Sequence, residues 1–423
     1  MIKSYKVMLK PNDKQTTRLF QFAGAARFAY NWTLEKQMTA FENGEKFISN
    51  NDLRKEFTVL RNSEGKEWLK NISNNVTKQA IKDCCNAYAN FFKKQKRTNI
   101  KYTKKKLAYL LKNGKKLTIY DMNGHPKFKS RRNGNFKFYQ DTDKIKITTM
   151  HVKLEKITTS KKKNRQKLNW IKLAEVDRIP TGVKYKQPRI SFDGLNWWLS
   201  VSIEFENSQD KNCNDAVGID LGVKDLAILS DGTIYENINK MPIIRQLKKK
   251  QCRLQRRISR KYENNKTEGG SYKKTRNIIK SEKQLLKLHQ RLKNIRHNYI
   301  HQVTTEIINR KPKLIVLEDL KIQGMMTNKH LSKAVQEQCL YEFRRQIEYK
   351  SEWSNIKIIV ADRYYPSSKT CIKCGFIKKD LKLKERIYHC PQCGNMIDRD
   401  LQAAINLKRY GEIKMNTQTL LRN

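Results

Sequence analysis

Two Cys-x-x-Cys-Gly segments near the C-terminus constrain the fold of this chain more than any other feature of its sequence. Cys371 and Cys374 form the first pair, Cys390 and Cys393 form the second, and fifteen residues separate the pairs. Four thiolates at this spacing are typical of one tetrahedral zinc site, and the glycines suit the tight turns such a site needs. Because four protein ligands leave no open position, the pattern predicts one structural Zn²⁺ and disfavours a disulfide or redox role.

The charge of the chain indicates the partner. Lys and Arg number 90 against 40 Asp and Glu, a formal net charge of +50 over 423 residues. Such a chain repels itself unless a polyanion neutralises it. Nucleic acid is the leading candidate, because each phosphate that a cation neutralises releases counterions and so favours binding.

No run approaches the roughly 20 apolar residues of a membrane-spanning helix, and residues 1–10 lack the apolar core of a signal peptide. We therefore expect a soluble, intracellular protein without a membrane partner. The other cysteines are expected to be reduced thiols.

Periodicity divides the chain into a helical part, a strand-rich part and a mixed part. Alternation predicts a strand over residues 2–10, and three- and four-residue spacing predicts helices over residues 14–42 and from residue 76 to 91. Strand-like runs follow at 144–157, 168–174, 187–193 and 197–205, and with the first strand they could close a basic barrel. The polar loop 206–214 is the expected main boundary. Residues 242–310 read as a basic helical hairpin whose charged face either is solvated or faces nucleic acid.

Three acidic residues stand at the ends of apolar segments. Asp220 ends the run that begins at Val217, Glu318 ends the run from Leu314, and Asp400 precedes an alanine-rich helix. Two of them have a plain structural alternative, a turn residue for Asp220 and a helix cap for Asp400. Taken together, three converging carboxylates could hold two Mg²⁺ ions and hydrolyse a phosphodiester. Strand alternation places Leu314, Val316 and Glu318 on one face, which predicts a carboxylate at the end of a buried face.

The order of these motifs resembles the TnpB family of transposon-encoded, RNA-guided DNA nucleases, which are similar to compact type V CRISPR effectors. The resemblance rests on G-I-D-L-G, L-E-D-L-K, the two cysteine pairs and D-x-x-A-A-x-N, and on N-terminal blocks at residues 26–31, 87–92 and 126–129. It implies that Asp220, Glu318 and Asp400 are the catalytic, magnesium-binding carboxylates. Asp319 and Asp398 are the rivals of the last two. The family has Asn where this chain has Gln402, which puts the hydrogen bonding near the site in question.

The resemblance also implies the architecture and the partners. The fold class expected is multidomain α+β: an RNase H-like RuvC nuclease domain with an inserted zinc ribbon, preceded by a wedge β-barrel with a helical recognition insert. The implied boundaries are 1–10 and 119–208 for the wedge, 11–118 for the helical domain, 209–366 for the nuclease domain, 367–396 for the ribbon and 397–423 for the third motif and tail. The partners implied are a guide RNA from the transposon end and double-stranded DNA, bound by a monomer or weak dimer. The alternatives are a compact type V CRISPR effector, a non-cutting RNA-guided DNA-binding protein and a non-cutting zinc-ribbon nucleic-acid-binding protein.

Overall fold

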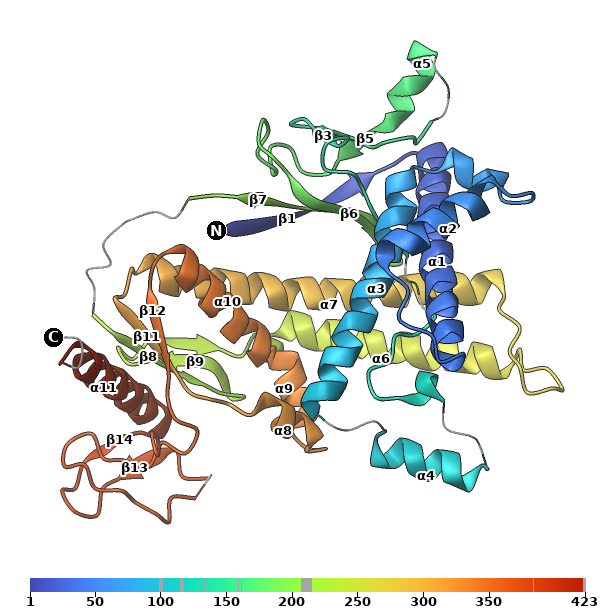
Figure 1. Cartoon of the computed structure of the whole chain (residues 1–423). Coiled ribbons are helices and arrows are strands. Elements are labelled where there is room, and N and C mark those ends of the chain that lie inside the picture. Colours follow the sequence, from blue (N-terminus) through green and yellow to red (C-terminus); the bar gives the residue numbers. More distant parts are fainter. Residues whose placement is uncertain are drawn as a thin grey trace. The chain divides into compact units, whose positions relative to one another are not determined.

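The protein consists of two compact units, residues 2–205 and residues 206–423 together with Met1 (Figure 1). The structure, a computed structural model, describes residues 1–98, 102–114, 118–132, 134, 136–158, 160, 162–206, 215–382 and 384–420. The division falls at the start of the polar loop 206–214. Residues 207–214 of that loop, including Cys213, lie outside the described residues.

The N-terminal unit combines helices with a seven-stranded sheet of order β2-β6-β7-β1-β5-β4-β3. Its elements are β1 (Ile2–Lys10), α1 (Asp13–Glu42), α2 (Asn50–Asn62), η1 (Glu67–Asn71), α3 (Asn74–Thr98), α4 (Lys104–Lys112), η2 (Ile119–Asp121), β2 (Phe136–Tyr139), β3 (Lys146–Ile147), β4 (His151–Lys153), α5 (Lys163–Gln166), η3 (Lys167–Asn169), β5 (Trp170–Leu173), β6 (Lys186–Phe192) and β7 (Trp197–Glu204). The strand predicted over residues 2–10 is confirmed as β1, which pairs antiparallel with both β7 and β5.

Helix α1 confirms the helix predicted over residues 14–42. Asn12 and Gln15 form a capping box, in which each side-chain oxygen accepts a hydrogen bond from the other residue's backbone N–H at 2.9 Å. This reciprocal pair satisfies two amide donors that a helix start leaves unpaired. Leu19, Phe22 and Ala29 then recur on one side and are fully buried in the core that α1 shares with the sheet.

The strands of this unit do not form a closed ring of hydrogen bonds. Among the described residues, β2 and β3 are the two edges of the sheet order and no ladder joins them. The expected strand over 144–157 is a hairpin of two short strands, β3 and β4, because Thr148 to Met150 turn the chain between them. Closure into a barrel therefore stays a prediction.

The C-terminal unit is built on a five-stranded mixed sheet of order β10-β9-β8-β11-β12. Its elements are β8 (Val217–Leu221), β9 (Asp225–Leu229), β10 (Ile234–Glu236), η4 (Ile238–Lys240), α6 (Pro242–Glu263), α7 (Arg276–Asn309), β11 (Leu314–Leu317), α8 (Ile322–Thr327), α9 (Ser332–Gln338), α10 (Leu340–Trp353), β12 (Lys357–Val360), β13 (Ile387–His389), β14 (Met396–Asp398) and α11 (Arg399–Leu420). Strands β8, β11 and β12 are parallel, whereas β8, β9 and β10 are antiparallel.

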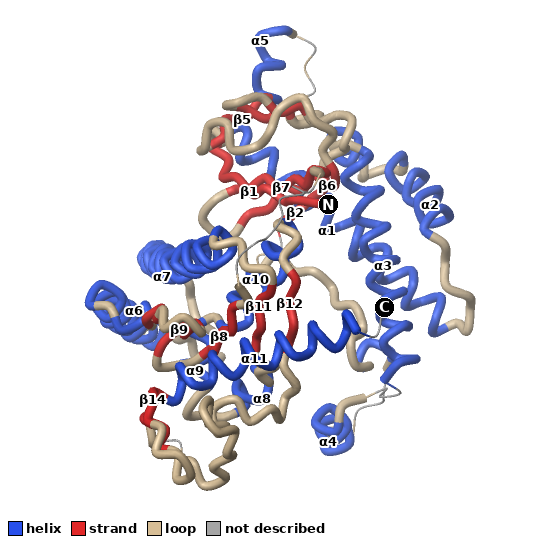
Figure 2. The backbone as a smooth tube through the Cα atoms, turned by 90° about the vertical axis from the view of Figure 1, so that its left-hand side faces the viewer, coloured by secondary structure: helices blue, strands red, loops and turns tan. Residues whose placement is uncertain are grey.

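Different helices cover the two faces of this sheet, and the pleat decides which strand residues meet which helix. Ile219, Ile315 and Leu317 belong to a buried cluster with residues of α7 and α10. The alternate residues Leu314 and Val316 belong to a second cluster with Leu407 of α11. Figure 2 shows α11 running across β8, β11 and β12. Since successive side chains point to opposite faces, the even-numbered residues of β8 and β11 lie on the α11 face.

Helices α6 and α7 confirm the helical hairpin predicted over residues 242–310. Ile244 and Leu247 of α6 pack with Leu288 and Leu292 of α7 in one buried cluster. The turn between the helices contains Gly270, whose φ of +71° favours glycine. A search of the described residues finds no helix with the length and apolar character required to cross a membrane.

Candidate functional site

Parallel pairing of β8 with β11 brings Asp220 and Glu318 to the same place in the sheet. Val316 is opposite Gly218 and Leu317 is opposite Ile219, where the pairing ends, so Glu318 and Asp220 each come one residue after the last pair. Asp220 follows the alternation of Gly218 and therefore belongs to the α11 face, and the same alternation predicts that face for Glu318 after Val316. The predicted alternation of Leu314, Val316 and Glu318 is consistent with this arrangement. Two carboxylates from sequence positions about a hundred residues apart thus lie side by side at the carboxyl ends of parallel strands.

Two glycines let α11 lie directly on the sheet. A Cβ atom at Gly218 would be 2.0 Å from the carbonyl oxygen of Ala404 and 2.5 Å from the amide nitrogen of Lys408. A Cβ atom at Gly411 would be 2.3 Å from a methyl carbon of Val316. No real Cβ atom tolerates such distances, so both positions require glycine for the helix to approach. This contact fixes the N-terminal turn of α11, and with it Asp400, relative to β8.

The electrostatics of Asp220 show that the three predicted carboxylates interact. Burial and, after it, the negative charges of Glu318 and Asp400 together raise the pKa of Asp220 to about 8, while the positive charge of Arg399 opposes them. Burial also raises the pKa of Glu318, with a contribution from Asp319. Within the described parts of the chain, neither the Asp220 nor the Glu318 carboxylate has a hydrogen-bond or ion-pair partner. Unpaired, partly buried carboxylates that repel one another are costly unless a cation joins them.

The rival of Glu318 has a structural role. Asp319 accepts hydrogen bonds from Arg363 at 2.7 Å and from Arg344 at 3.3 Å, and these guanidinium groups hold its pKa below the ordinary value. Its charge is therefore already neutralised by two arginines, whereas that of Glu318 is not.

The rival of Asp400 also has a structural role. The Asp398 carboxylate accepts from the backbone N–H groups of Asp400 at 2.9 Å and Leu401 at 3.1 Å, so Asp398 caps α11. The alternative reading of Asp400 as the helix cap is therefore wrong. Among the described residues, no backbone N–H donates to the Asp400 carboxylate, and the guanidinium group of Arg386 is 3.7 Å from it.

A cleft of about 360 Å³ opens beside these groups. Asp220 and Asp400 line it together with Arg386, Arg399 and Leu331, whereas Glu318 is not among the lining residues. Sequence reasoning missed the two arginines, although Arg399 lies inside the D-R-D segment that it singled out. Two cations beside acidic groups in a cleft are suited to hold an anionic substrate such as a phosphodiester.

The polar residues of the third motif tie α11 to the loop that leads into the first cysteine pair. Asn406 donates to the carbonyl oxygens of Ser367 and Thr370, both at 2.7 Å, and Gln402 donates to that of Ser368 at 3.2 Å. Both side chains are buried, and the Gln402 Oε1 atom has no hydrogen-bond partner within the described residues. Gln402 therefore bonds to backbone and not to the carboxylates, which answers the question raised by its departure from the family pattern.

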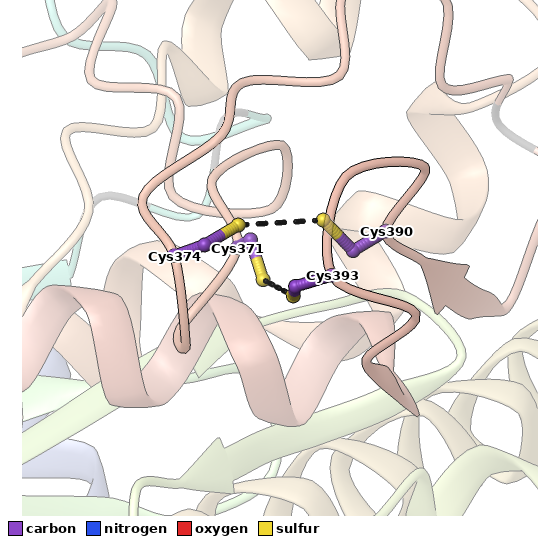
Figure 3. A group of neighbouring side chains, drawn as sticks. All are labelled: Cys371, Cys374, Cys390 and Cys393. Atoms are coloured by element: carbon purple, nitrogen blue, oxygen red, sulfur yellow. Dashed lines mark hydrogen bonds between the residues drawn. The ribbon is translucent and has the colours of Figure 1, made fainter.

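The four predicted cysteines form one group (Figure 3). Sulfur distances are 3.6 Å between Cys371 and Cys393 and 3.5 Å between Cys374 and Cys390, and all four sulfur atoms lie within 4.8 Å of one another. Tetrahedral zinc with Zn–S bonds of about 2.3 Å separates its sulfur ligands by about 3.8 Å, so the group has the size of a zinc site. A disulfide would require about 2.05 Å, which excludes that reading here. Across the described residues, no carboxylate group is comparably tight.

The two cysteine pairs have matching backbone turns. Gly375 donates its N–H to the Cys371 carbonyl oxygen at 3.0 Å, and Gly394 donates to that of Cys390 at 3.1 Å. The φ values of these glycines are +76° and +69°, in the region that favours glycine. Although burial opposes charge on Cys390, the amide groups of Cys393 and Gln392 lower the pKa of its thiol to about 6. Amides directed at sulfur therefore favour the thiolate form of Cys390. At Cys374 the Phe376 amide acts in the same direction, but burial and the three neighbouring thiols raise the pKa of its thiol to about 12.

Three family models match successive parts of the chain. The model described as "Probable transposase" matches residues 199–329, "Cas12f1-like, TNB domain" matches residues 341–407, and "Helix-turn-helix domain" matches residues 1–46. The last description does not agree with the structure, in which residues 1–46 form strand β1 and the single long helix α1.

Relatives extend the similarity over nearly the whole chain. An Escherichia coli (strain K12) protein provisionally named RNA-guided DNA endonuclease InsQ is 28% identical, with 97% of this chain and 92% of that protein covered. A Streptomyces pristinaespiralis protein provisionally named RNA-guided DNA endonuclease is 25% identical, with coverage of 97% and 89%. Fold and site define a mixed α+β protein with converging carboxylates and a four-cysteine group. The sequence matches make the chain similar to proteins named as RNA-guided DNA endonucleases, in agreement with its resemblance to the TnpB family.

Solved structures give weaker matches. A Cas12f1–sgRNA–target DNA complex matches with a TM-score of 0.33 and 17% identity, covering 96% of this chain and 99% of that one. CasPhi-2 bound to crRNA and phosphorothioate DNA matches with a TM-score of 0.48 and 10% identity, covering 97% and 91%. Both TM-scores are too low to establish a common fold.

Proposed function

We propose that this chain is an RNA-guided DNA endonuclease of a transposon, and that Asp220, Glu318 and Asp400 hold two Mg²⁺ ions for phosphodiester hydrolysis. The proposal rests on the different bonding partners of five acidic residues. The two rivals are bound by arginines or cap a helix, whereas Asp220 and Glu318 have no such partner in the described residues and Asp400 has only Arg386, 3.7 Å away. Similarity to proteins named as RNA-guided DNA endonucleases supports the guide RNA and the DNA target.

The residues of the site suit this chemistry. Two Mg²⁺ ions, when bound, activate the attacking water and stabilise the leaving oxygen. The donors are all carboxylate oxygens, which Mg²⁺ prefers. Asp220 must release its proton to serve as a ligand, and the positive charge of Arg399 favours that release. Arg386 and Arg399 line the cleft with Asp220 and Asp400, where they would hold the phosphate in place.

We extend the proposal to the domain boundaries of the chain. We assign the mixed five-stranded sheet with α11 to a RuvC-like, RNase H-like nuclease domain covering residues 209–366 and 397–423. Residues 367–396 would be a ribbon that binds one structural Zn²⁺. Residues 1–10 and 119–208 would be the wedge, and residues 11–118 the helical recognition domain. The protein would act in the cytoplasm of a prokaryote and at the nucleoid when it is bound to DNA.

Single alanine substitutions test the assignment of the active site. We expect Asp220→Ala, Glu318→Ala and Asp400→Ala each to reduce magnesium-dependent DNA cleavage by more than about 100-fold, because each removes a metal ligand. The RNA that copurifies should stay bound. Cleavage is measured on target DNA with the purified RNA complex at saturating Mg²⁺.

Matched controls come from the neighbouring acids. Asp398→Ala should keep its cleavage rate at low temperature but lose about 1 kcal/mol of stability, because it loses the cap of α11. Full cleavage by Asp400→Ala together with its loss in Asp398→Ala would contradict the assignment.

A further inference from the structure

The N-terminal unit has a second cleft, of about 700 Å³, that no step of the proposed cleavage reaction uses. It lies between one face of α1 and the short helix η1 with the residues that follow it. Gly24, Arg27, Phe28 and Trp32 line it from α1, and Trp68 lines it from η1. Nucleotide-sized ligands bind in cavities of roughly 300–1,000 Å³, so the volume fits one nucleotide.

Aromatic rings form much of the wall. Trp68 is 43% exposed, and its ring meets the Phe28 ring edge-on at 5.6 Å between centroids. Trp32 meets Phe57 in the same way at 5.2 Å, and Phe28 contacts Phe57 at 6.2 Å. These contacts fix the orientation of the rings. Fixed and partly exposed rings are the platforms on which unpaired nucleobases stack.

The two arginines of the cleft differ in what they already bind. Arg18 donates to the backbone carbonyl oxygens of Asn71, Lys156 and Ile157, so its guanidinium group joins α1 to the end of η1 and to the segment after β4. Arg27, in contrast, has a buried Nη1 atom with no hydrogen-bond partner in the described part of the chain. Arg27 also lines a smaller cleft beside Asp83 and Arg189. An unsatisfied buried donor is costly, and a turn of the Arg27 side chain toward an acceptor on a ligand in the larger cleft would remove that cost. A phosphate oxygen or a base carbonyl is such an acceptor.

Gly24 keeps the floor of the cleft open. It lies inside α1, where glycine is about 1 kcal/mol less favourable than alanine. A Cβ atom there would meet nothing within 4 Å, and the residue has no positive φ. Neither packing nor backbone conformation therefore requires glycine at this position. A side chain at residue 24 would extend into the cleft.

We propose that this cleft between α1 and η1 binds one unpaired nucleotide of the bound nucleic acid, with its base stacked on the aromatic wall and an acceptor atom on Arg27. The inference rests on the proposed function in that it requires a nucleic-acid partner. The net charge of +50 favours a nucleotide over an apolar peptide as the occupant. The nucleotide belongs either to the guide RNA or to the DNA, which offer the same chemistry.

Ultraviolet crosslinking followed by mass spectrometry tests the contact directly. The full chain with its copurified RNA is irradiated with and without target DNA and then digested with trypsin. We expect a nucleotide adduct on the peptide Glu67–Lys70, which contains Trp68, or on the α1 peptide that contains Phe28 and Trp32. The adduct mass separates a ribonucleotide from a deoxyribonucleotide and so identifies the source. Crosslinks elsewhere in the chain with none on these peptides would overturn the inference.

A pair of substitutions at residue 24 tests the cleft by filling it. Gly24→Ala should bind the crosslinked nucleic acid like the wild type, with an equal or higher melting temperature. Gly24→Leu should show the same melting temperature but about tenfold weaker binding, because its side chain occupies the space of the base. Trp68→Ala should weaken binding similarly, and Trp68→Phe should restore it.

The results separate this inference from the proposed function. If Gly24→Leu binds and cleaves like Gly24→Ala while the wild type cuts DNA under RNA guidance, the inference fails and the proposed function stands. If the wild-type chain binds neither RNA nor DNA, both fail.

Discussion

In the C-terminal unit, the hydrogen-bond and ion-pair partners of each acidic residue separate the proposed metal ligands from their neighbours more clearly than the surrounding sequence does. Asp319 and Asp398 are adjacent to proposed ligands or nearly so, yet each already has its charge compensated within the fold. Asp220 and Glu318 lack such compensation, and each comes one residue after the last pair between β8 and β11. At the residue scale, the proposed site therefore combines two carboxylates without a partner in the described residues, Asp220 and Glu318, with Asp400, whose carboxylate lies 3.7 Å from Arg386.

Sequence alternation predicts that Glu318 lies on the same face as Val316, and this stays a prediction because β11 itself ends at Leu317. It was not sufficient to decide between Asp398 and Asp400. That choice depends on where α11 begins, and helix ends are uncertain by one or two residues in any sequence pattern. The arginines that pair with Asp319 could not be found either, since Arg344 and Arg363 come from distant segments and only the tertiary fold brings them together.

The raised pKa of Asp220 predicts a pH-dependent stability in protein freed of divalent metal. An aspartate has a pKa of about 3.9 in the unfolded chain, against about 8 here, so the folded state keeps a proton that unfolding releases between these values. Stability must then fall as pH rises from about 4 to 8. Asp220→Asn removes this effect and should be more stable than wild type at pH 8 in EDTA, by at most about 5 kcal/mol, and nearly equal at pH 4.

Thermal unfolding of both proteins across this pH range provides the measurement. Asp319→Asn is the matched control, because it deprives Arg344 and Arg363 of their partner and should lower the melting temperature instead. If Asp220→Asn were the less stable protein in EDTA at pH 8, the buried, unpaired state of this carboxylate would be refuted.

At the scale of elements, α11 connects the sheet to the four-cysteine group. Its glycine contacts fix it on β8 and β11, while the Arg399 side chain donates to the Lys382 carbonyl oxygen at 3.1 Å and its backbone N–H donates to that of Arg386 at 2.8 Å. The sequence predicted the helix and the cysteine group as separate features. It did not predict that Gly218 is needed by the helix, because a glycine in a strand has several possible causes.

Gly218→Ala should therefore displace α11 and move Asp400 away from Asp220. We expect a loss of about 1–3 kcal/mol in stability, typical of overpacking, with a large loss of cleavage. Gly269→Ala is the control, since a Cβ atom there meets nothing within 4 Å and the residue has no positive φ. Chemical denaturation measures the stability of both variants, and a DNA cleavage assay measures their activity. Wild-type cleavage in Gly218→Ala would show that the close approach does not position Asp400.

The cysteine group should bind one zinc ion per chain, and Cys390→Ser should lose it. Because metal-binding energy is local folding energy, we expect faster hydrogen exchange in residues 371–398 and at the start of α11. Cys252→Ser, an exposed cysteine outside the group, should change neither zinc content nor exchange. Metal analysis of protein prepared without added zinc is the measurement, and a ratio near zero in the wild type would remove the zinc site.

At the scale of the whole molecule, the charge of the chain was the feature most reliably interpreted from sequence. Composition alone predicts a polyanionic partner, since no arrangement of 40 acidic residues can neutralise 90 basic ones. Composition does not show whether the bound nucleic acid determines where the DNA is cleaved. Bound RNA should stabilise the fold by mass action, and its affinity should fall steeply with added salt.

Replacing the guide segment of the bound RNA tests the central claim most directly. The complex is assembled with two RNAs that differ only in that segment and is offered DNA that contains both matching targets, each with its natural flank. Sequencing of the DNA ends then locates the cuts. If the proposal is right, the cut moves to the target that matches the new segment, requires Mg²⁺ and disappears in Asp400→Ala. A cut that stays at the same site with either RNA, or that occurs equally with RNA-free protein, would contradict RNA-guided cleavage.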